Sequence, residues 1–315
     1  MSQGNSDNVD AVTPLSNSLS GAIQQYYDLT KPRVVMLIVF TAFVGMLLAV
    51  QGMPNLLTVF AASLGIGLAA SSGAAMNQII DMRADAIMAR TQNRPLATGG
   101  LNVWQAIIFA ALLCVLGMFV LVVWVNTLTA ILTFISMVGY GVIYTVFLKP
   151  ASPQNIVIGG AAGAAPPLLG WVAMTGSITA EGCLLFLIIF AWTPPHFWAL
   201  ALYRREEYAE AGVPMLPVTH GEEFTRLQIL LYTYILVAVT LMPFSIHMFG
   251  GLYLIGAFYL NARFMYYVYR LYKRYSDELS QATFYYSIKY LMCLFGVMLV
   301  DHYFWDRLVL ILGWT

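Results

Sequence analysis

Charged residues are scarce in this sequence, since Asp, Glu, Lys and Arg together make up 10% of its 315 residues, whereas a soluble domain carries about 25%. Hydrophobic residues account for 60%, and the mean hydropathy is +0.75. A soluble fold of this size would expose too much apolar surface, so we expect lipid to be the solvent. The 15 basic and 15 acidic residues cancel, which excludes the basic footprint of a nucleic-acid-binding protein.

Cysteine is also rare, and its three copies are Cys114, Cys183 and Cys293. All three lie in apolar runs, and their spacing matches no metal-binding pattern. We therefore expect neither a disulfide framework nor a zinc site, and interpret the cysteines as small packing residues.

The first 25 residues lack Lys and Arg but contain Asp7 and Asp10. A secretory signal begins with basic residues before an apolar stretch, and a mitochondrial transit peptide is rich in Arg and poor in acids. Because neither description applies, we expect residues 1–25 to form a disordered cytoplasmic tail and residues 26–315 to form a transmembrane domain. The expected location is the bacterial inner membrane.

Long apolar runs dominate the remainder and predict an all-α, polytopic membrane protein. A helix needs roughly 20 apolar residues to cross the hydrocarbon core. Runs of this kind predict about nine transmembrane helices, near residues 34–51, 56–80, 104–125, 127–147, 154–175, 178–202, 227–246, 251–272 and 284–306.

Basic residues occur on alternate connections between these spans. They precede the first span and recur in every second connection, whereas the connections at 51–55, 126, 175–178 and 247–250 contain none. The positive-inside rule therefore places the N-terminus and the basic connections in the cytoplasm. Two of these connections, 81–103 and 203–226, are long and rich in charge, so we expect the chemistry at the cytoplasmic face.

Three polar residues recur at every fourth position where the second span ends: Asn77, Asp81 and Asp85. On a helix this spacing stacks them along one face. Two neighbouring carboxylates repel each other, and a bound cation relieves the repulsion. Mg²⁺ suits this arrangement because it takes one or two carboxylates and shares its other positions with phosphate oxygens. We therefore predict that Asp81 and Asp85 hold Mg²⁺ on a diphosphate.

Arg90 and Arg94 follow directly, also four residues apart. Guanidinium groups are preferred partners of phosphate, so both are candidate diphosphate ligands. The alternative is a solvated juxtamembrane turn whose charges only mark the interface. That alternative leaves the two acids unexplained, because positive charge alone is enough to anchor a span.

The end of the sixth span contains an ionisable residue among aromatic residues and prolines. It reads Trp192-Thr193-Pro194-Pro195-His196-Phe197-Trp198. His196 lies about two turns below the predicted cytoplasmic end, and an ionisable residue at that depth is a functional-site candidate. Prolines within a span are expected to kink it and are tolerated where the backbone faces a cavity. The alternative for His196 is a hydrogen bond to a neighbouring helix.

The first of these segments resembles the N-x-x-x-D-x-x-x-D motif of the UbiA superfamily of intramembrane prenyltransferases. With Arg90, Arg94 and Pro95 it looks like the heme O synthase branch. The segment at His196 is similar to that branch's W-x-P-P-H-F-W sequence, and the acidic-Tyr-x-x-x-G-x-P-M loop that follows in the branch corresponds here to Glu207, Tyr208, Gly212, Pro214 and Met215. The resemblance runs from about residue 26 to the end of the ninth span.

Two positions depart from the branch. Glu207 stands where the branch often has Asp, so the carboxylate is retained while its part in metal binding stays open. Pro150 stands where the branch usually has a basic residue, in a segment that contains Tyr144 and Lys149. Lys149 remains a candidate diphosphate contact, and its alternative role is that of an interfacial anchor.

The resemblance implies a UbiA-type bundle that transfers the farnesyl group of farnesyl diphosphate to a vinyl group of heme b, with addition of water, giving heme O and diphosphate. It implies Mg²⁺ as cofactor, and a downstream heme-modifying oxidase is a candidate partner. His196 would hold heme through its iron, since imidazole is a common axial ligand. The implied catalytic residues are Asn77, Asp81, Asp85 and Glu207, and the implied substrate-binding residues are Arg90, Arg94, Tyr144, Lys149, His196, Arg204 and Tyr208.

Two other functions remain open from the sequence. A UbiA-type prenyltransferase could act on a quinone precursor, although the His196 segment favours heme. A membrane transporter also uses broken helices and buried charges. Transporters usually place the polar site near the midplane, whereas the acidic residues here gather at one face.

Overall fold

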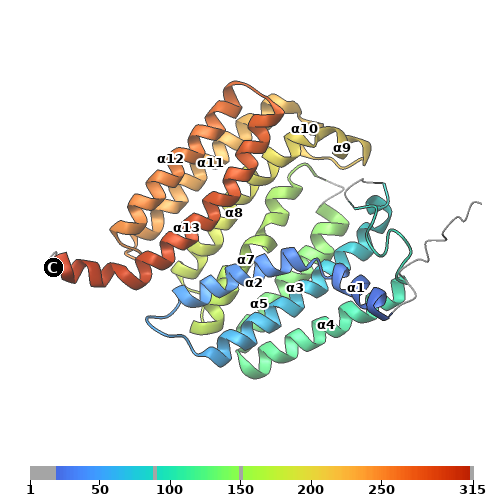
Figure 1. Ribbon diagram of the computed structural model, residues 1–315, viewed down its shortest axis with the longest axis horizontal. Coiled ribbons are helices and arrows are strands. Elements are labelled where there is room, and N and C mark those ends of the chain that lie inside the picture. Colours follow the sequence, from blue (N-terminus) through green and yellow to red (C-terminus); the bar gives the residue numbers. More distant parts are fainter. Residues whose placement is uncertain (1–18, 88–90, 149–151, 313–315) are drawn as a thin grey trace, which may run out of the picture.

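The computed structural model describes residues 19–87, 91–148 and 152–312 (Figure 1), and within these ranges its regular structure is entirely helical. This confirms the predicted fold class. In chain order the elements are α1 (Leu19–Leu29), α2 (Pro32–Leu48), α3 (Leu56–Asp85), α4 (Val103–Trp124), α5 (Thr127–Val138), η2 (Gly139–Leu148), α7 (Asn155–Thr175), α8 (Ala180–Tyr203), α9 (Arg205–Glu210), α10 (Leu216–Thr219), α11 (Gly221–Ser245), α12 (Gly251–Lys273) and α13 (Asp277–Leu312).

Each predicted span corresponds to a helical segment, but the count of nine membrane crossings is not confirmed. Within the described ranges, seven segments are long and apolar enough to cross a membrane: α3, α4, α5 with η2, α7, α8, α11 and α13. An eighth is the α1–α2 pair, which is bent by 52°. The remaining helix, α12, has 23 residues, and its apolar character is diluted by Asn261, Arg263 and several tyrosines.

The predicted tail and loops contain more helix than expected. Residues 19–25 belong to α1, so helical structure begins before the predicted tail boundary. Asp81 and Asp85 lie within α3, so the predicted loop 81–103 starts later than expected. The predicted loop 203–226 contains α9, α10 and the first turn of α11. Capping residues and short turns of helix leave little trace in a hydropathy pattern, which explains these differences.

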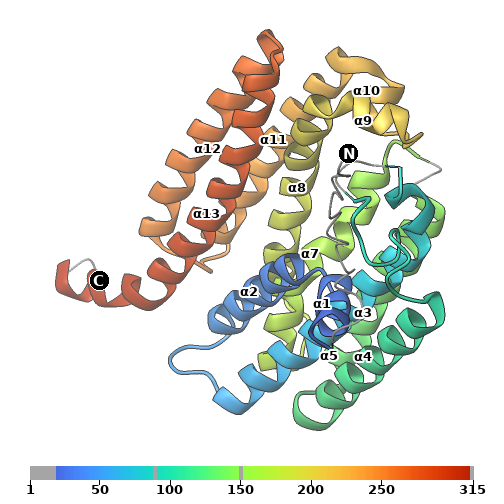
Figure 2. The same ribbon diagram turned by 45° about the vertical axis from the view of Figure 1, so that its right-hand side comes forward.

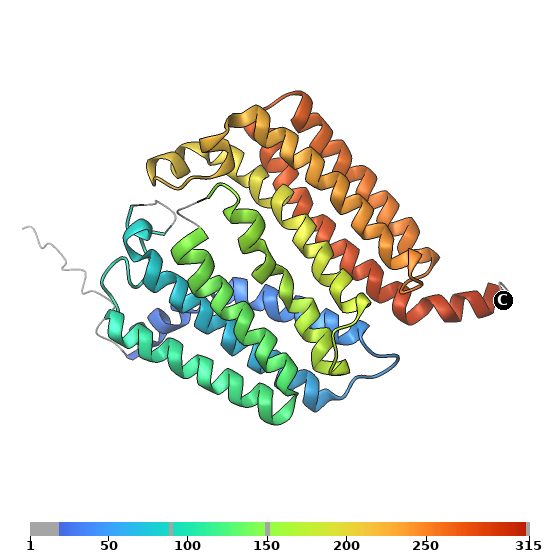
Figure 3. The same cartoon turned by 180° about the vertical axis from the view of Figure 1, so that it is seen from behind.

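The helices form two groups that meet at α7 (Figures 1 and 3). The later helices α8, α11, α12 and α13 pack on one side, and α2 to α5 pack on the other. Helix α7 contacts both α2 and α8. Its sequence is rich in Gly and Ala, and such small residues let helices approach closely where lipid provides no hydrophobic drive between them.

The contact between α2 and α7 has almost no side-chain layer. A Cβ atom at Gly45 of α2 would overlap the backbone carbonyl of Pro167, and one at Gly170 of α7 would overlap that of Ala42. Only glycine fits at these two positions, because the opposing backbone occupies the space of any side chain. We call this contact the glycine seam.

The segments that carry the predicted chemistry lie at one end of the bundle. In Figures 1 and 2, α9 and α10 occupy the same end as the segment that joins α3 to α4. The break between α1 and α2 is at Lys31, which adopts a left-handed backbone conformation with φ 52°.

Candidate active site

A polar stripe of three residues, Asn77, Asp81 and Asp85, lies along the last turns of α3. Their exposed fractions are only 4%, 9% and 4%. Buried carboxylates are stabilised only when charges or hydrogen-bond donors compensate them. The neighbours of the stripe therefore define the site.

Asn77 connects the stripe to two other elements. Its side-chain amide nitrogen donates to Asp81 Oδ2 at 3.0 Å and to Thr145 Oγ1 of η2 at 3.1 Å. Its side-chain oxygen accepts a hydrogen bond from the Lys31 ammonium. The amide is thereby fixed in one orientation, with its donors toward the acid and its acceptor toward the cation.

Asp85 is compensated by the segment that follows α3. Arg94 Nη1 lies 2.5 Å from Asp85 Oδ2, and the two side chains are 22% and 6% exposed. Thr91 Oγ1 donates to the Asp85 backbone carbonyl at 3.0 Å, which holds the segment against the helix end. The structure thus brings Arg94 to the stripe, whereas Arg90 lies outside the described residues.

The π-helix η2 packs against α3 and forms a second wall of the candidate site. Thr145 Oγ1 donates to the Tyr140 carbonyl five residues earlier at 2.9 Å, a spacing that suits the wider π-helical turn. Tyr144 stacks on Tyr140 with ring centroids 5.9 Å apart and lies within electrostatic range of Asp81 and Tyr208. Gly159 of α7 leaves room for the Tyr144 ring. Short π-helical segments often occur at functional sites, and this one brings Tyr144 toward the stripe.

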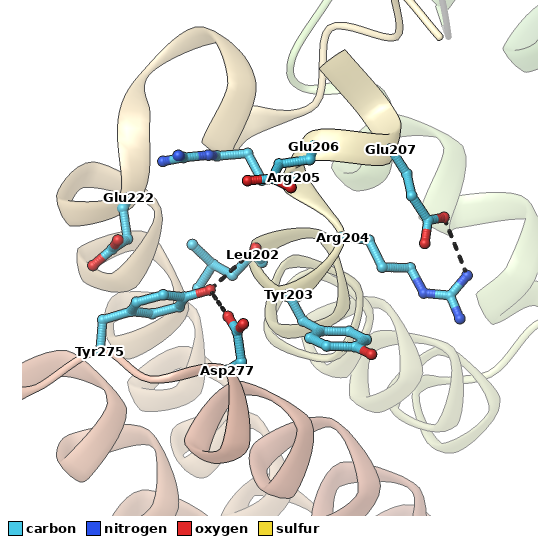
Figure 4. A pocket seen from close by; sticks show the side chains of 9 residues that line it. All are labelled: Leu202, Tyr203, Arg204, Arg205, Glu206, Glu207, Glu222, Tyr275 and Asp277. Carbon is cyan, nitrogen blue, oxygen red and sulfur yellow. Dashed lines mark hydrogen bonds and ion pairs between the residues drawn. The ribbon is translucent and has the colours of Figure 1, made fainter. Parts of the chain in front are cut away.

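The second loop forms a pocket of about 390 Å³ beside the end of α8. Figure 4 shows Arg204 and Glu207 on the side of this pocket away from Tyr275 and Asp277. Arg204 Nη1 lies 3.7 Å from Glu207 Oε2, with side chains 29% and 48% exposed. A partly solvated pair of this kind contributes little to stability.

On the other side of this pocket, the Tyr275 hydroxyl donates to Asp277 Oδ1 at 2.5 Å, and its oxygen also lies 3.3 Å from the Leu202 carbonyl oxygen (Figure 4). Burial raises the pKa of Tyr275 above its ordinary value, and the hydrogen bond to Asp277 adds to this increase. The phenol is therefore a neutral donor that ties the start of α13 to the end of α8.

His196 is a residue of α8, and its side chain contacts α13. Helix α8 continues through Pro194 and Pro195, and His196 is 7% exposed. Its Nδ1 lies 2.7 Å from Ser287 Oγ, and its ring stacks between Trp192 and Phe284 at centroid distances of 4.2 and 4.6 Å. This arrangement contains the inter-helix hydrogen bond that the sequence left open as the alternative for His196.

The Ser287 contact fixes the tautomer of His196. Ser287 Oγ donates its own proton to the Phe284 carbonyl at 2.6 Å, so it accepts the proton of His196 Nδ1. The Nε2 atom is then the unprotonated nitrogen. A ligating imidazole commonly has its other N–H engaged in this way.

The stripe fits a divalent cation. No group of three His, Cys, Asp or Glu side chains converges on one point in the described part of the chain. Two carboxylates four residues apart are nevertheless a suitable protein contribution for Mg²⁺, since a diphosphate and water complete its coordination. Of the predicted metal and diphosphate ligands, Asp81, Asp85 and Arg94 are together, and Lys149 lies outside the described residues.

The structure adds three residues that sequence patterns do not single out for the site: Lys31, Tyr140 and Thr145. In the sequence, Lys31 is a cytoplasmic charge in a segment, Leu29-Thr30-Lys31-Pro32-Arg33, that resembles the family's entry to the first span, with no role in the site assigned to it. Its position directly before Pro32, at a break between helices, is the available signal. Tyr140 and Thr145 depend on the π-helical turn, which apolar periodicity does not reveal.

The chain is similar to known proteins over nearly its whole length. The model of the UbiA prenyltransferase family matches residues 38–312. A protein of Thioalkalivibrio sulfidiphilus named protoheme IX farnesyltransferase is 59% identical over 289 residues, which cover 92% of this chain and 96% of that protein. A protein of the same name from Thiobacillus denitrificans is 60% identical, over 89% of this chain and 94% of that protein.

Solved structures share the fold at low sequence identity. A structure of digeranylgeranylglyceryl phosphate synthase has a TM-score of 0.78 at 20% identity and covers 89% of this chain and 98% of its own. A UbiA homolog from Archaeoglobus fulgidus, bound to DMAPP and Mg²⁺, has a TM-score of 0.64 at 14% identity and covers 87% of this chain and 99% of its own.

Proposed function

The chain belongs to the UbiA prenyltransferase family, and from this premise we propose that it farnesylates protoheme IX. The farnesyl group of farnesyl diphosphate is transferred to a vinyl group of heme b with addition of water, which gives heme O and diphosphate. The observation that carries this proposal is the 59% identity, over 92% of the chain, to a relative named protoheme IX farnesyltransferase. The chain is thus an enzyme of the class that its motifs resembled.

The polar stripe is the proposed binding site for the diphosphate. Asp81 and Asp85 would hold Mg²⁺, which neutralises negative charge on the diphosphate. The relative from Archaeoglobus fulgidus that was solved with DMAPP and Mg²⁺ supports this assignment. Arg94 has donors to spare beyond its bond to Asp85, so it can contact a phosphate oxygen while it remains paired.

The reaction begins at the allylic carbon–oxygen bond of farnesyl diphosphate. When this bond breaks, its electron pair stays on the diphosphate, and the positive charges of Arg94 and Lys31 stabilise the increasing negative charge. The farnesyl cation forms beside the tyrosines of η2, where exclusion of water prevents its premature capture. The vinyl group of heme b supplies the electron pair for the new carbon–carbon bond. Water adds to the cation that remains on heme and loses a proton.

His196 is the proposed ligand of the heme iron. With Nδ1 engaged by Ser287, Nε2 has the lone pair that iron requires. The ring is held by Trp192 and Phe284, so its orientation is set before heme binds. Glu207 and Tyr208 are proposed to act from the second loop, since Tyr208 lies within electrostatic range of Tyr144.

The protein is a polytopic membrane protein, and we propose that it resides in the bacterial inner membrane. The N-terminus and the loops at the active-site end would face the cytoplasm, where water-soluble diphosphate leaves after the reaction. A downstream heme-modifying oxidase is the proposed recipient of heme O. An impermeant thiol reagent tests the orientation in a variant with Glu210→Cys and with serine at the three native cysteine positions, since reaction only in inverted vesicles agrees with it.

Mass analysis of the product tests the function. The purified chain in lipid nanodiscs is incubated with farnesyl diphosphate, heme b and Mg²⁺, and heme O is the expected product. Asp81→Asn serves as the inactive control. Prenylation of a quinone precursor in place of heme, or movement of an unchanged substrate across vesicles, would contradict the proposal.

A further inference from the structure

A second groove lies between α12 and α13 and is separate from the polar stripe. Its volume is about 450 Å³, and its lining includes Tyr259, Arg263, Tyr267, Tyr286, Lys289 and Cys293. Arg263 and Lys289 are both exposed. The groove therefore combines two cations with several aromatic rings.

Both cations lie well inside their helices. Ten residues separate Arg263 from the end of α12 at Lys273, and twelve separate Lys289 from the start of α13 at Asp277. At about 1.5 Å per residue these separations are about 15 and 18 Å, so both cations are remote from the charged helix ends at the predicted cytoplasmic interface. A cation at that depth requires a compensating partner.

The described part of the chain provides only neutral partners for Arg263. Its Nη1 donates to the Tyr259 hydroxyl at 3.4 Å, and its guanidinium lies 5.9 Å from the centre of the Tyr286 ring. No described carboxylate forms an ion pair with Arg263 or Lys289. An anion from another molecule would therefore compensate both cations.

A second copy of the chain does not supply this anion from its described residues. Among the described acids, Asp301 is the one placed well inside a long helix. It is 2% exposed and accepts hydrogen bonds from the backbone nitrogens of Gly250 and Tyr253. Phospholipid phosphates lie at the membrane interface and not at this depth. The groove thus suits an amphiphile that carries two acidic groups on a flat apolar body.

We propose that the groove binds a tetrapyrrole with two propionate groups, as a docking site for heme outside the active site. The two cations match two carboxylates, and charge-assisted hydrogen bonds of this kind are strong in a medium of low dielectric. The tyrosines offer ring faces to a flat macrocycle, and the volume lies within the range of small-molecule sites. The inference rests on the proposed function, because that function makes heme the membrane-borne substrate.

Counting heme equivalents tests the docking site. The protein in phosphatidylcholine nanodiscs is titrated with ferric heme b, and the Soret change of empty nanodiscs is subtracted. Two equivalents per chain are expected for the unaltered protein. Arg263→Gln combined with Lys289→Gln should lower the affinity for one of the two hemes by roughly tenfold or more, since the double substitution removes both charge-assisted contacts.

Matched variants separate the groove from a general loss of charge. Arg270 and Lys273 are also exposed cations over tyrosine rings of α12, with centroid distances of 5.4 and 5.5 Å. Arg270→Gln with Lys273→Gln should retain both equivalents, as should the charge-retaining Arg263→Lys with Lys289→Arg. Heme dimethyl ester has no free carboxylates, so it should not bind at the site formed by Arg263 and Lys289, and one equivalent per chain should remain.

Four results would overturn the proposal: one equivalent in the unaltered protein, equal loss in the control pair, unchanged binding of the dimethyl ester, or displacement of heme by phosphatidylglycerol. Heme O formation in the same preparation distinguishes this inference from the proposed function. If heme O forms but the chain binds only one heme, the docking site in the groove is rejected and the proposed function stands. If the chain binds two hemes but forms no heme O, the proposed function is rejected and the docking site stands.

Discussion

Lys31 donates a hydrogen bond to the side-chain oxygen of Asn77, 46 positions later in the chain. The contact depends on the left-handed backbone of Lys31, which turns the chain between α1 and α2. Such a conformation costs a residue other than glycine roughly 1–2 kcal/mol. The cation is therefore held at the polar stripe against a local backbone preference.

The Lys31→Gly substitution separates the effect of the left-handed backbone conformation from the effect of the side-chain ammonium. Glycine adopts positive φ without penalty, which offsets the cost of leaving the buried Asn77 oxygen without its donor, so the free energy of unfolding should change by less than about 1 kcal/mol. Loss of the ammonium should raise the KM for farnesyl diphosphate by roughly tenfold, the value of one charge-assisted contact. Thermal unfolding and steady-state kinetics measure the two effects. Arg33→Gln, a neighbouring exposed cation, is the control, and an equal rise in its KM would argue against a specific role for Lys31.

Replacement of either stripe acid should abolish turnover. Asp81→Asn or Asp85→Asn removes a carboxylate needed to hold Mg²⁺ on the diphosphate, and we expect a loss in kcat of at least roughly a hundredfold. Chelation of Mg²⁺ should have the same effect on the unaltered enzyme. Heme O formation measures both. Asp28→Asn, an exposed acid on α1 bonded to Gln24, is the control. Full activity of purified Asp81→Asn would refute the metal assignment.

The Asp85–Arg94 pair allows stability and activity to be separated. Arg94→Gln leaves the buried Asp85 carboxylate without its cation, which should lower the free energy of unfolding by about 3 kcal/mol. Adding Asp85→Asn should recover most of that stability but no activity. Chemical denaturation and product assays follow the two properties. If the double variant regains turnover, the pair has a structural role only.

Glu207 tests whether the second loop takes part in the reaction. The carboxylate is about half exposed and pairs with Arg204 at 3.7 Å, so Glu207→Gln should change stability by less than about 1 kcal/mol. We expect Glu207→Asp to stay active, since it keeps the carboxylate, and Glu207→Gln to lose much of its activity. Equal kcat/KM in all three proteins would assign Glu207 to the solvated loop.

His196→Ala should weaken heme binding while binding of a non-hydrolysable farnesyl diphosphate analogue is retained. Titration of the purified variant with each ligand measures both. Ser287→Ala is the matched comparison, because it removes the partner of Nδ1 and leaves Nε2 in place; we expect about 1 kcal/mol of destabilisation and a smaller loss of heme affinity than for His196→Ala. If His196→Ala binds heme normally and yields as much heme O, His196 only packs α8 against α13.

Much of the fold could be predicted because hydropathy reports directly on helices in lipid. The four-residue spacing of Asn77, Asp81 and Asp85 is by itself enough to place them on one helix face. The predicted count of nine membrane crossings is not confirmed, since α12 carries Arg263 and many tyrosines and so departs from a simple apolar run.

The site was predicted where it is local in sequence and missed where it depends on long-range contacts. Arg94 lies nine residues from Asp85, so one short segment already indicated both. Lys31 and Thr145 meet Asn77 across 46 and 68 positions. Their contacts depend on a left-handed residue and on a π-helical turn, and neither leaves a distinct signature in residue type.

The glycine seam between α2 and α7 bears on how substrates reach the site. At Gly45 and Gly170 the opposing backbones leave no layer of side chains between α2 and α7 that could repack. Helix α7 therefore packs directly on α2, and its contact with α8 joins the two helix groups into one frame, which argues against the rocking halves of an alternating-access carrier. In such a frame, amphiphilic substrates would arrive by lateral diffusion from the bilayer, and local motion of loops would suffice for each catalytic cycle.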